Sequence, residues 1–202
     1  MSQSQTFNTA IELIDAANRE DPNQEMAEGK PCPKELIYSQ RMSDMLQRYR
    51  PDADEAMQLA VRAQHIERWK SPRDAYPADR KGYLHWRKDL YKFHAETAVG
   101  LLAQAGCSEE TIERVKQAVS KQSIKTNPDT QLLEDVAGLV FIEHYMEGFA
   151  ARHPEYDEAK WLDIIRKTWR KMSPQAHEFA LSGKLQLPEP LIPLIQKAVS
   201  GD

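Results

Sequence analysis

The sequence predicts an all-α protein that folds as a single-domain helical bundle of about seven to nine helices. Apolar residues recur at steps of three and four along most of the chain, as they do on the buried face of a helix. We find no stretch with the strict alternation of apolar and polar residues that marks a half-buried strand. The chain has 202 residues, of which 41% are hydrophobic and 29% are charged. This length suffices for one buried core and is too short for two ordinary domains.

The first two helices are expected on either side of a polar loop. The first one ends before Asp21-Pro22, and the loop continues to Pro33 with turn-forming Gly and Pro residues. Its apolar stripe consists of Phe7, Ala10, Ile11, Ile14 and Ala17. The second helix ends at Pro51, and its face consists of Tyr38, Met42, Met45, Leu46 and Tyr49.

The third and fourth helices flank the one long internal connection that is rich in turn formers, Ser71 to Gly82. Asp52 or Asp54 is expected to cap the third helix, which leads to His65. The fourth helix is expected from about Tyr83 to Ala105 with two distinct faces. Its core face is predicted as Trp86, Leu90, Phe93, Thr97 and Leu101. A neighbouring face carries Tyr83, Arg87, Tyr91 and His94 at steps of three and four.

The remaining helices follow in close succession. Ser108 is expected to open a fifth helix, and Asp129 to cap a sixth that runs through residues 130–150. This sixth helix is apolar on more than one face, which is typical of the central element of a bundle. A seventh helix is predicted over residues 156–172, and Ser173-Pro174 begins an eighth. The core spans about residues 7–182, and residues 183–202 form a proline-containing C-terminal extension expected on the outside of the domain.

A basic and aromatic segment, Arg62 to His94, stands out within an acidic protein. It holds nine of the 27 Lys and Arg residues and only four Asp or Glu, so it carries +5 (9 − 4) while the rest of the chain carries −9 (−4 − 5). It also holds three of the six His, two of the four Trp and three of the seven Tyr. The segment is therefore expected to form the wall of an anion site, with phosphate as the expected anion.

Arginines in this segment are the predicted phosphate ligands. A guanidinium group presents a planar fork that binds two phosphate oxygens at once. Pro72 and Pro77 fix the backbone of the connecting loop, which lowers the entropy cost of presenting its side chains. The predicted substrate-binding residues are Trp69, Arg73, Tyr76, Arg80, Tyr83, Trp86 and Arg87. The alternative is a solvated loop held by cation–π contacts between these arginines and aromatic rings.

Two carboxylates, Glu134 and Asp135, interrupt the apolar run of the sixth helix. At least one of them is expected on the buried side, where an unpaired carboxylate would cost several kcal/mol. One alternative is a structural salt bridge to Arg62 or Arg87. The other is a functional role as a metal ligand or general base.

Two histidines are further candidates. His65 lies near the end of a helix whose stripe is mostly alanine, so a ligand or a neighbouring helix can approach it closely. His94 lies beside Tyr91 and Arg87 and is a candidate catalytic residue. For each histidine the alternative is a core residue whose hydrogen bonds are satisfied.

Several function classes lack support. The N-terminal residues do not resemble a signal peptide, and no window approaches 18 uninterrupted apolar residues, so we expect no membrane association. Cys32 and Cys107 are far apart in the sequence, as expected for two reduced thiols in a cytoplasmic protein. The net charge of −4 argues against a general nucleic-acid coat. The sequence contains none of the common phosphate-loop, dinucleotide-binding, zinc-protease or serine-hydrolase motifs.

The run RAQHIERWKSPRDAYPADRKGYLHWRKDLYKFHAE, followed by QLLEDVAGLVFIE, resembles the bacterial and fungal family catalogued as domain of unknown function 4202. The resemblance extends from FNTAIELIDAANREDP to the central helix and beyond. This family brings no established activity with it, so the resemblance implies a common fold and leaves the function to be argued from the residues.

A fainter resemblance is to the metal-dependent HD phosphohydrolases, which are helical. His65 matches the first histidine of their site, and Asp135 in EDVAGL is similar to their distal aspartate. This resemblance implies a divalent transition metal (Mn, Fe or Ni) on His65 and Asp135, with His94 as an accessory histidine. The sequence departs from the family at His85-Trp86, where Trp stands in place of the aspartate of the His-Asp doublet. Glu134 could rebuild the metal site, or the arginines could replace the metal.

Two hypotheses on function follow. The first is an HD-like protein with a phosphate-binding pocket, acting as a metal-dependent phosphohydrolase on a nucleotide or another phosphorylated small molecule. Its catalytic residues would be His94, Glu134 and Asp135. The alternative is a non-catalytic protein that binds a nucleotide or RNA with the same Arg and Trp side chains.

Overall fold

The computed structural model describes residues 4–27 and 29–200, and within them the chain is mostly helical. These described residues form ten α-helices, one π-helix, short 3-10 segments and a single two-stranded hairpin. The all-α class is thereby confirmed, while the helix count exceeds the seven to nine expected. Additional short helices arise because a π-helical segment interrupts the chain after α6 and because the C-terminal residues form a helix of their own. None of the described helices is long and apolar enough to cross a bilayer.

The chain divides into two compact units, residues 1–133 and residues 134–202. The division falls within α6 (Pro128–Val140). The prediction of one domain over the whole chain stays a prediction, and each unit is described by itself below.

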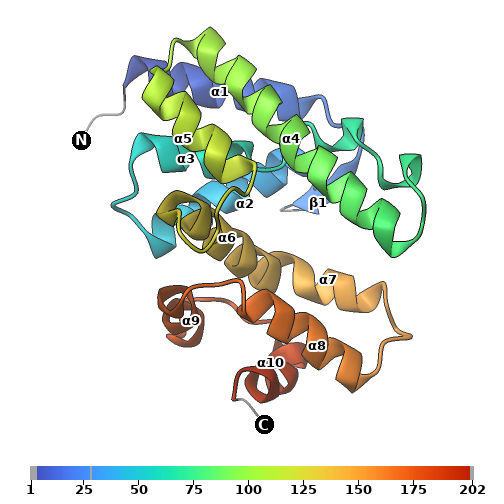
Figure 1. Cartoon of the computed structure of the whole chain (residues 1–202). Helices are drawn as coiled ribbons and strands as arrows, with labels where there is room; N and C mark the ends of the chain where they lie inside the picture. The colour runs from blue at the N-terminus through green and yellow to red at the C-terminus, as the bar shows by residue number, and fades with distance from the viewer. Residues whose placement is uncertain (1–3, 28, 201–202) are drawn as a thin grey trace. The chain divides into compact units, whose positions relative to one another are not determined.

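Unit 1 is built around the long helix α4 (Arg80–Ala105), which packs against α1 and α5 (Figure 1). Helix α3 packs against α2 and α5. The other elements of this unit are α1 (Gln5–Arg19), β1 (Gln24–Ala27), β2 (Lys30–Pro33), α2 (Lys34–Tyr49), α3 (Glu55–Ala63), η1 (Arg68–Lys70), η2 (Arg73–Ala75) and α5 (Glu109–Val119). The side chain of Asp54 caps α3 by accepting the Met57 N–H, as the sequence predicted.

The β1–β2 hairpin was not predicted from the sequence. Its strands are antiparallel, from the pair Gln24 and Pro33 to the pair Ala27 and Lys30. Strands of four residues that contain prolines and lie mostly on the surface show no alternation of apolar and polar residues. The buried carboxylate of Asp21 holds the base of the hairpin, because it accepts the Asn23 N–H at 2.9 Å and the Glu35 N–H at 2.9 Å. Asp21 thereby caps α2, whose preceding residue offers no capping side chain.

Helix α4 begins three residues earlier than predicted, at Arg80. The reason is Asp79, whose carboxylate accepts the Gly82 N–H at 2.7 Å and caps the helix there. Arg80 therefore lies on a helix and not on loop backbone. Trp86 and Leu90 are buried as predicted, but the buried face continues as His94, Ala95, Ala98 and Leu102. Phe93, Thr97 and Leu101 are only half-buried, so the predicted core stripe was wrong over the second half of the helix.

Unit 2 contains the remainder of α6 and a succession of short helices. In order these are η3, a π-helix (Phe141–Tyr145), α7 (Met146–Ala151), α8 (Glu158–Trp169), α9 (Pro174–Leu181), η4 (Glu189–Leu191) and α10 (Ile192–Val199). Helix α10 packs against α8, and the two lie side by side in Figure 1. The C-terminal segment contributes Leu191, Ile195 and Ala198 to the buried residues of this unit.

We expect Gly82→Ala to destabilise the protein, because a Cβ at this position would lie 2.2 Å from the carbonyl oxygen of Pro77. Relief of that clash requires the proline loop to move, at a cost of about 1–3 kcal/mol. Gly100→Ala is the matched control in the same helix, since a Cβ there meets no atom of the described chain within 4 Å. This control should gain about 1 kcal/mol from helix propensity. Urea unfolding of both variants measures the difference, and equal midpoints would contradict the close approach at Gly82.

Candidate functional site

Two of the predicted site residues, His65 and His94, lie together in unit 1. His65 belongs to the turn after α3, and His94 lies on the buried face of α4. Their ring centroids are 5.7 Å apart. We refer to His65 and His94, together with the neighbouring side chains of Glu35 and Arg68, as the His65 site.

A single peptide bond, Ile66–Glu67, fixes the backbone of this site from both sides. The Nδ1 of His94 donates to the Ile66 carbonyl at 2.8 Å, and the Glu67 N–H donates to the Asn18 side chain at 3.0 Å. Glu67 has φ = 50° and ψ = 31°, a left-handed conformation that costs free energy at a residue other than glycine. The two hydrogen bonds hold the turn in this conformation, so that His65 and Arg68 extend from a fixed backbone.

The other ring nitrogen of His94 is a buried acceptor. Because the Ile66 carbonyl can only accept, Nδ1 carries the proton of the neutral ring and Nε2 keeps its lone pair. The pKa of His94 is lowered to about 3, chiefly by burial, and the charges of Arg68 and Lys121 act in the same direction. Nε2 is buried and has no hydrogen-bond partner among the residues that the structure describes. A buried acceptor of this kind calls for a donor from outside the chain.

His65 lies between a carboxylate and a guanidinium group. Its ring stacks on Tyr38 at 4.2 Å between centroids. Its Nδ1 lies 3.7 Å from Glu35 Oε2, and Arg68 Nη1 lies 3.4 Å from its Nε2. Burial lowers the pKa of His65 well below its ordinary value, and the nearby positive charges of Arg68, Lys121 and Lys34 act in the same direction. Both imidazoles are therefore neutral at pH 7 in a region of positive potential.

Glu35 belongs to this site and was missed in the sequence. It lies in the first turn of α2, and its residue is 5% exposed. Burial raises the pKa of Glu35 to about 7, although the charges of Arg68 and Lys34 oppose the change. The helical spacing could have revealed it, because Glu35 lies seven and eleven residues before Met42 and Leu46 on the same buried face.

Arg73, the first of the predicted phosphate ligands, is occupied with its own loop. Its guanidinium donates to the carbonyls of Tyr76 at 3.0 Å and Pro77 at 2.7 Å. Trp86 Nε1 donates to the Ser71 carbonyl at 3.0 Å, and the Tyr76 hydroxyl donates to Asp89 at 3.0 Å. These contacts support the alternative that the loop is held by its own side chains. An open depression on its surface is lined by Arg73, Asp74, Tyr76 and Ala78.

Cation–π contacts form a continuous ladder of alternating arginine and aromatic side chains. Arg68 lies 5.1 Å from the centroid of Trp86, and Arg73 lies 5.9 Å from it. Arg73 and Arg87 each lie 5.8 Å from the ring of Tyr83. Arg87 also donates to the Tyr91 hydroxyl. Arg68 belongs both to this ladder and to the His65 site. The ladder therefore leads from the His65 site to the surface of α4.

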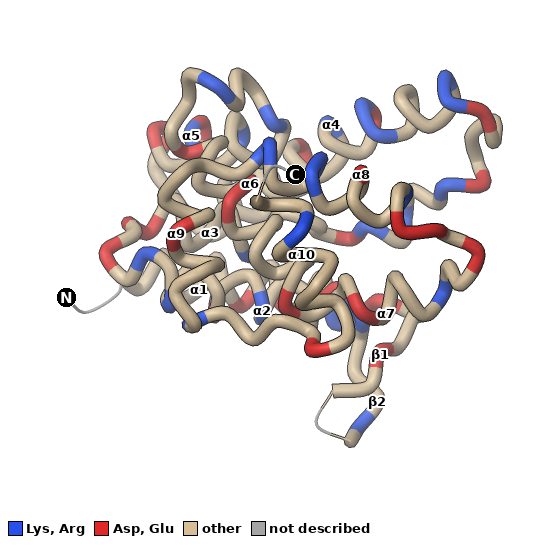
Figure 2. Tube along the Cα trace, turned by 90° about the horizontal axis from the view of Figure 1, so that it is seen from below, with Lys and Arg blue, Asp and Glu red and all other residues tan. Residues whose placement is uncertain are grey.

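The other predicted members of the arginine pocket are differently placed. Arg80 is exposed, while Trp69 is half-buried in η1. Figure 2 shows that Lys and Arg residues recur along α4. The side chain of Arg80 makes no hydrogen bond or ion pair with any residue in the described ranges, so its guanidinium is available to a ligand.

Asp135, the predicted metal ligand and catalytic carboxylate, lies in unit 2 and is buried as expected. Its two oxygens accept the Ser173 N–H at 2.7 Å and the Ser173 hydroxyl at 2.6 Å. Ser173 is in turn the N-cap of α9. Its neighbour Glu134 is half-buried. In unit 1, Arg62, one of the partners considered for these carboxylates, binds Asp15 at 2.6 Å.

No group of three or more His, Cys, Asp or Glu side chains that could hold a metal ion is found among the described residues. The positive charges of Arg68 and Lys121 that act on His65 would also repel a metal cation bound to its ring. The expected Mn, Fe or Ni stays a prediction that elemental analysis of the purified protein can test.

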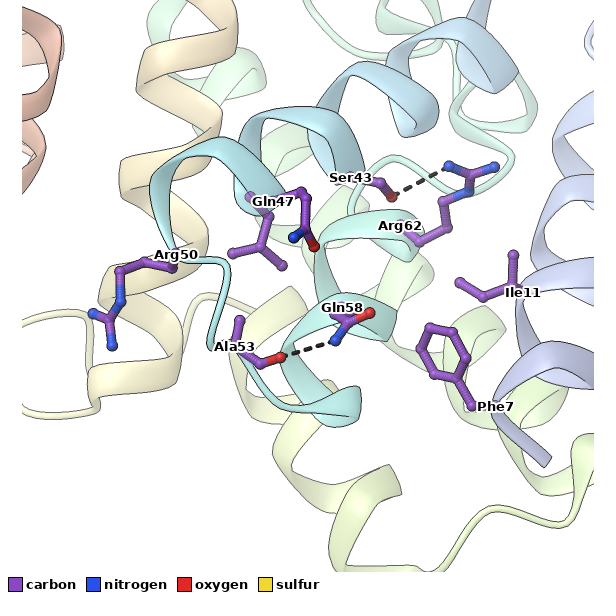
Figure 3. A pocket seen from close by; sticks show the side chains of 9 residues that line it. Phe7, Ile11, Ser43, Gln47, Arg50, Ala53, Gln58 and Arg62 are labelled. Carbon is purple, nitrogen blue, oxygen red and sulfur yellow. Dashed lines mark hydrogen bonds between the residues drawn. The ribbon is translucent and has the colours of Figure 1, made fainter. Parts of the chain in front are cut away.

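A cavity of about 250 Å³ in unit 1 lies between α1, α2 and α3 (Figure 3). Phe7 and Ile11 are among its apolar lining residues, and Arg62 and Gln58 are among its polar ones. Arg62 donates to Ser43, and Gln58 donates to the Ala53 carbonyl. Since these polar groups are engaged within the chain, this cavity offers less to a ligand than the His65 site does.

The fold and the site define an all-α protein with a pair of neutral imidazoles, one buried and one half-buried, among cations. A family model described as a domain of unknown function, DUF4202, matches residues 8–195. The chain belongs to this family, as its motifs indicated. No curated protein matches the chain, and no solved structure matches it. The likeness to HD phosphohydrolases stays a prediction.

We expect Glu35→Gln to stabilise the protein at pH 8 but not at pH 4.5. The pKa of Glu35 is about 7 in the folded protein and 4.5 ordinarily, so the buried carboxyl is protonated and neutral at pH 4.5. As the pH rises from 4.5 through 7, the folded protein loses stability because the charged carboxylate is disfavoured by burial. Glutamine stays neutral and avoids this loss. The variant should therefore gain on the order of 2–3 kcal/mol above pH 7. Urea unfolding at both pH values measures this gain. A difference between variant and wild type that does not depend on pH would contradict the raised pKa.

Asp135→Ala should lower the free energy of unfolding by about 2–4 kcal/mol. The substitution leaves two donors of Ser173 without their acceptor and uncouples the start of α9 from α6. Glu147→Ala, at an exposed position of α7 in the same unit, is the matched control and should change little. Thermal unfolding of the two variants compares them. Similar melting temperatures would remove the structural role of Asp135.

Proposed function

We propose that the His65 site binds the phosphate group of a phosphorylated small molecule and hydrolyses the phosphate ester bond. Nucleotides are the first class of ligand to test. The observation that carries the proposal is the lone pair of His94 Nε2, which is buried and without a partner among the described residues. A hydroxyl group or an attacking water would supply the missing donor. The positive charges of Arg68, Lys121 and Lys34 that act on the two imidazoles favour an anionic ligand beside it.

Each residue would have a defined part in the reaction. Arg68 would bind phosphate oxygens through its planar fork. Glu35 would orient the ring of His65, to which it lies close. His94 Nε2 would take one proton from the attacking water as its oxygen bonds to phosphorus, and would return it to the ester oxygen as the P–O bond breaks. The products would be an alcohol and phosphate, with no net gain or loss of protons on the protein.

A non-catalytic binder of the same ligands is the second candidate. The observation that favours it is the partner of His94 Nδ1, which is a carbonyl and not a carboxylate. A carbonyl stabilises an imidazolium less than a carboxylate does. The nearby cations also disfavour the positively charged form of His94. Binding with or without turnover distinguishes the two candidates.

Arg68→Met should weaken the binding of phosphorylated small molecules at least tenfold, because it removes both the charge and the fork. Arg19→Met is the matched control, since Arg19 lies exposed at the end of α1. Isothermal titration with a panel of nucleoside monophosphates, together with a phosphate-release assay, measures binding and turnover. The proposal fails if the wild type binds no member of the panel, or if both variants bind equally well.

A further inference from the structure

Helix α4 carries an exposed basic strip that ends at the His65 site. Arg80, Lys81, Leu84 and Lys88 are exposed, and Tyr91 follows three residues after Lys88. Positions separated by three, four and seven residues share one face of a helix, so these five residues form a strip along α4. His94 lies one step of three beyond Tyr91. From Arg80 to His94 the strip extends about 21 Å, at about 1.5 Å per residue.

The side chains of three cations of this strip are free of polar contacts with the described residues. Those of Arg80, Lys81 and Lys88 form no hydrogen bond or ion pair with residues 4–27 and 29–200. Tyr83 and Leu84 are among the few large apolar side chains that the described surface exposes, at 41% and 56%. Free cations beside an exposed aromatic ring are typical of surfaces that bind single-stranded nucleic acid, where phosphates meet the charges and bases meet the rings.

The strip and the site are continuous through the cation–π ladder. Arg68 contacts both His65 and Trp86, and Trp86 lies 5.9 Å from Tyr83. The loop before α4 is held rigidly by Arg73 and by the close approach of Gly82 to Pro77, so the strip begins from a fixed position. A ligand that filled the His65 site and extended beyond it would find charged side chains along α4 for several further phosphates.

We infer that the ligand of the His65 site is the phosphorylated end of a single-stranded nucleic acid, whose following nucleotides lie along the strip of α4. The inference rests on the proposed function and narrows its ligand class. The net charge of −4 does not oppose it, because the segment that holds the strip carries +5 (9 − 4). A short end fits this local charge better than a long duplex, which would also meet the acidic remainder of the surface.

The test measures the affinity of the full chain for 5′-phosphorylated oligonucleotides of one, four and eight nucleotides, as RNA and as DNA, by fluorescence anisotropy. The eight-mer should bind at least tenfold more tightly than the mononucleotide. The affinity of the eight-mer should also fall more steeply with salt than that of the mononucleotide. For three further phosphate contacts, its slope of log K against log [salt] should be more negative by about 2. The RNA and DNA arms show which sugar is preferred, and a gain with length in either one supports the inference.

Variants separate this inference from the proposed function. Lys81→Glu/Lys88→Glu should abolish the gain with length and leave mononucleotide affinity within about twofold. Arg68→Met should weaken mononucleotide and eight-mer alike. If affinity does not depend on length while Arg68→Met still weakens mononucleotide binding, the inference falls and the proposed function stands. If Arg68→Met changes nothing, both fall. Equally strong competition by polyglutamate would also overturn the inference, because it would indicate a surface for acidic proteins.

Discussion

The two hydrogen bonds to the Ile66–Glu67 peptide are the constraint on which the His65 site depends. His94 of α4 binds its carbonyl, and Asn18 of α1 binds its N–H. Through this one peptide, two helices that are far apart in the sequence fix a left-handed turn. This turn sets the positions of His65 and Arg68. Without it, neither the neutral imidazole pair nor the arginine that joins it to the cation–π ladder would have a defined position.

The site combines features that oppose stability, which is common where a protein binds or transforms a ligand. A carboxyl is buried at Glu35, and a non-glycine residue adopts a left-handed conformation at Glu67. An acceptor of His94 is buried with no donor from residues 4–27 and 29–200. Each of these would be easier to avoid than to keep in a purely structural helix bundle. Their occurrence within one small region is the physical reason to place function there.

Much of the fold could be predicted from the sequence, because helical periodicity and caps such as Asp54 are local signals. The hairpin could not, since Asp21 acts on the N–H of Glu35, a contact between distant residues that short-range patterns do not reveal. The start of α4 was missed although its cap, Asp79, makes the same local contact as Asp54 does. For the site, the sequence indicated His65 and His94 but not that they meet. It missed Glu35, and it did not reveal that the guanidinium of Arg73 donates to loop carbonyls, because a guanidinium group suits either a carbonyl or a phosphate.

Asp21 gives the N-terminal hairpin an importance that its exposed strands do not suggest. The same carboxylate holds the first residues after α1 and the N–H of Glu35 at the start of α2. Sequence changes within the family should therefore fall into two zones. Insertions and deletions near Gly29 would lengthen or shorten a surface turn, whereas changes in length next to Asp21 or Lys34 would shift the register of α2 and carry Glu35 out of the site.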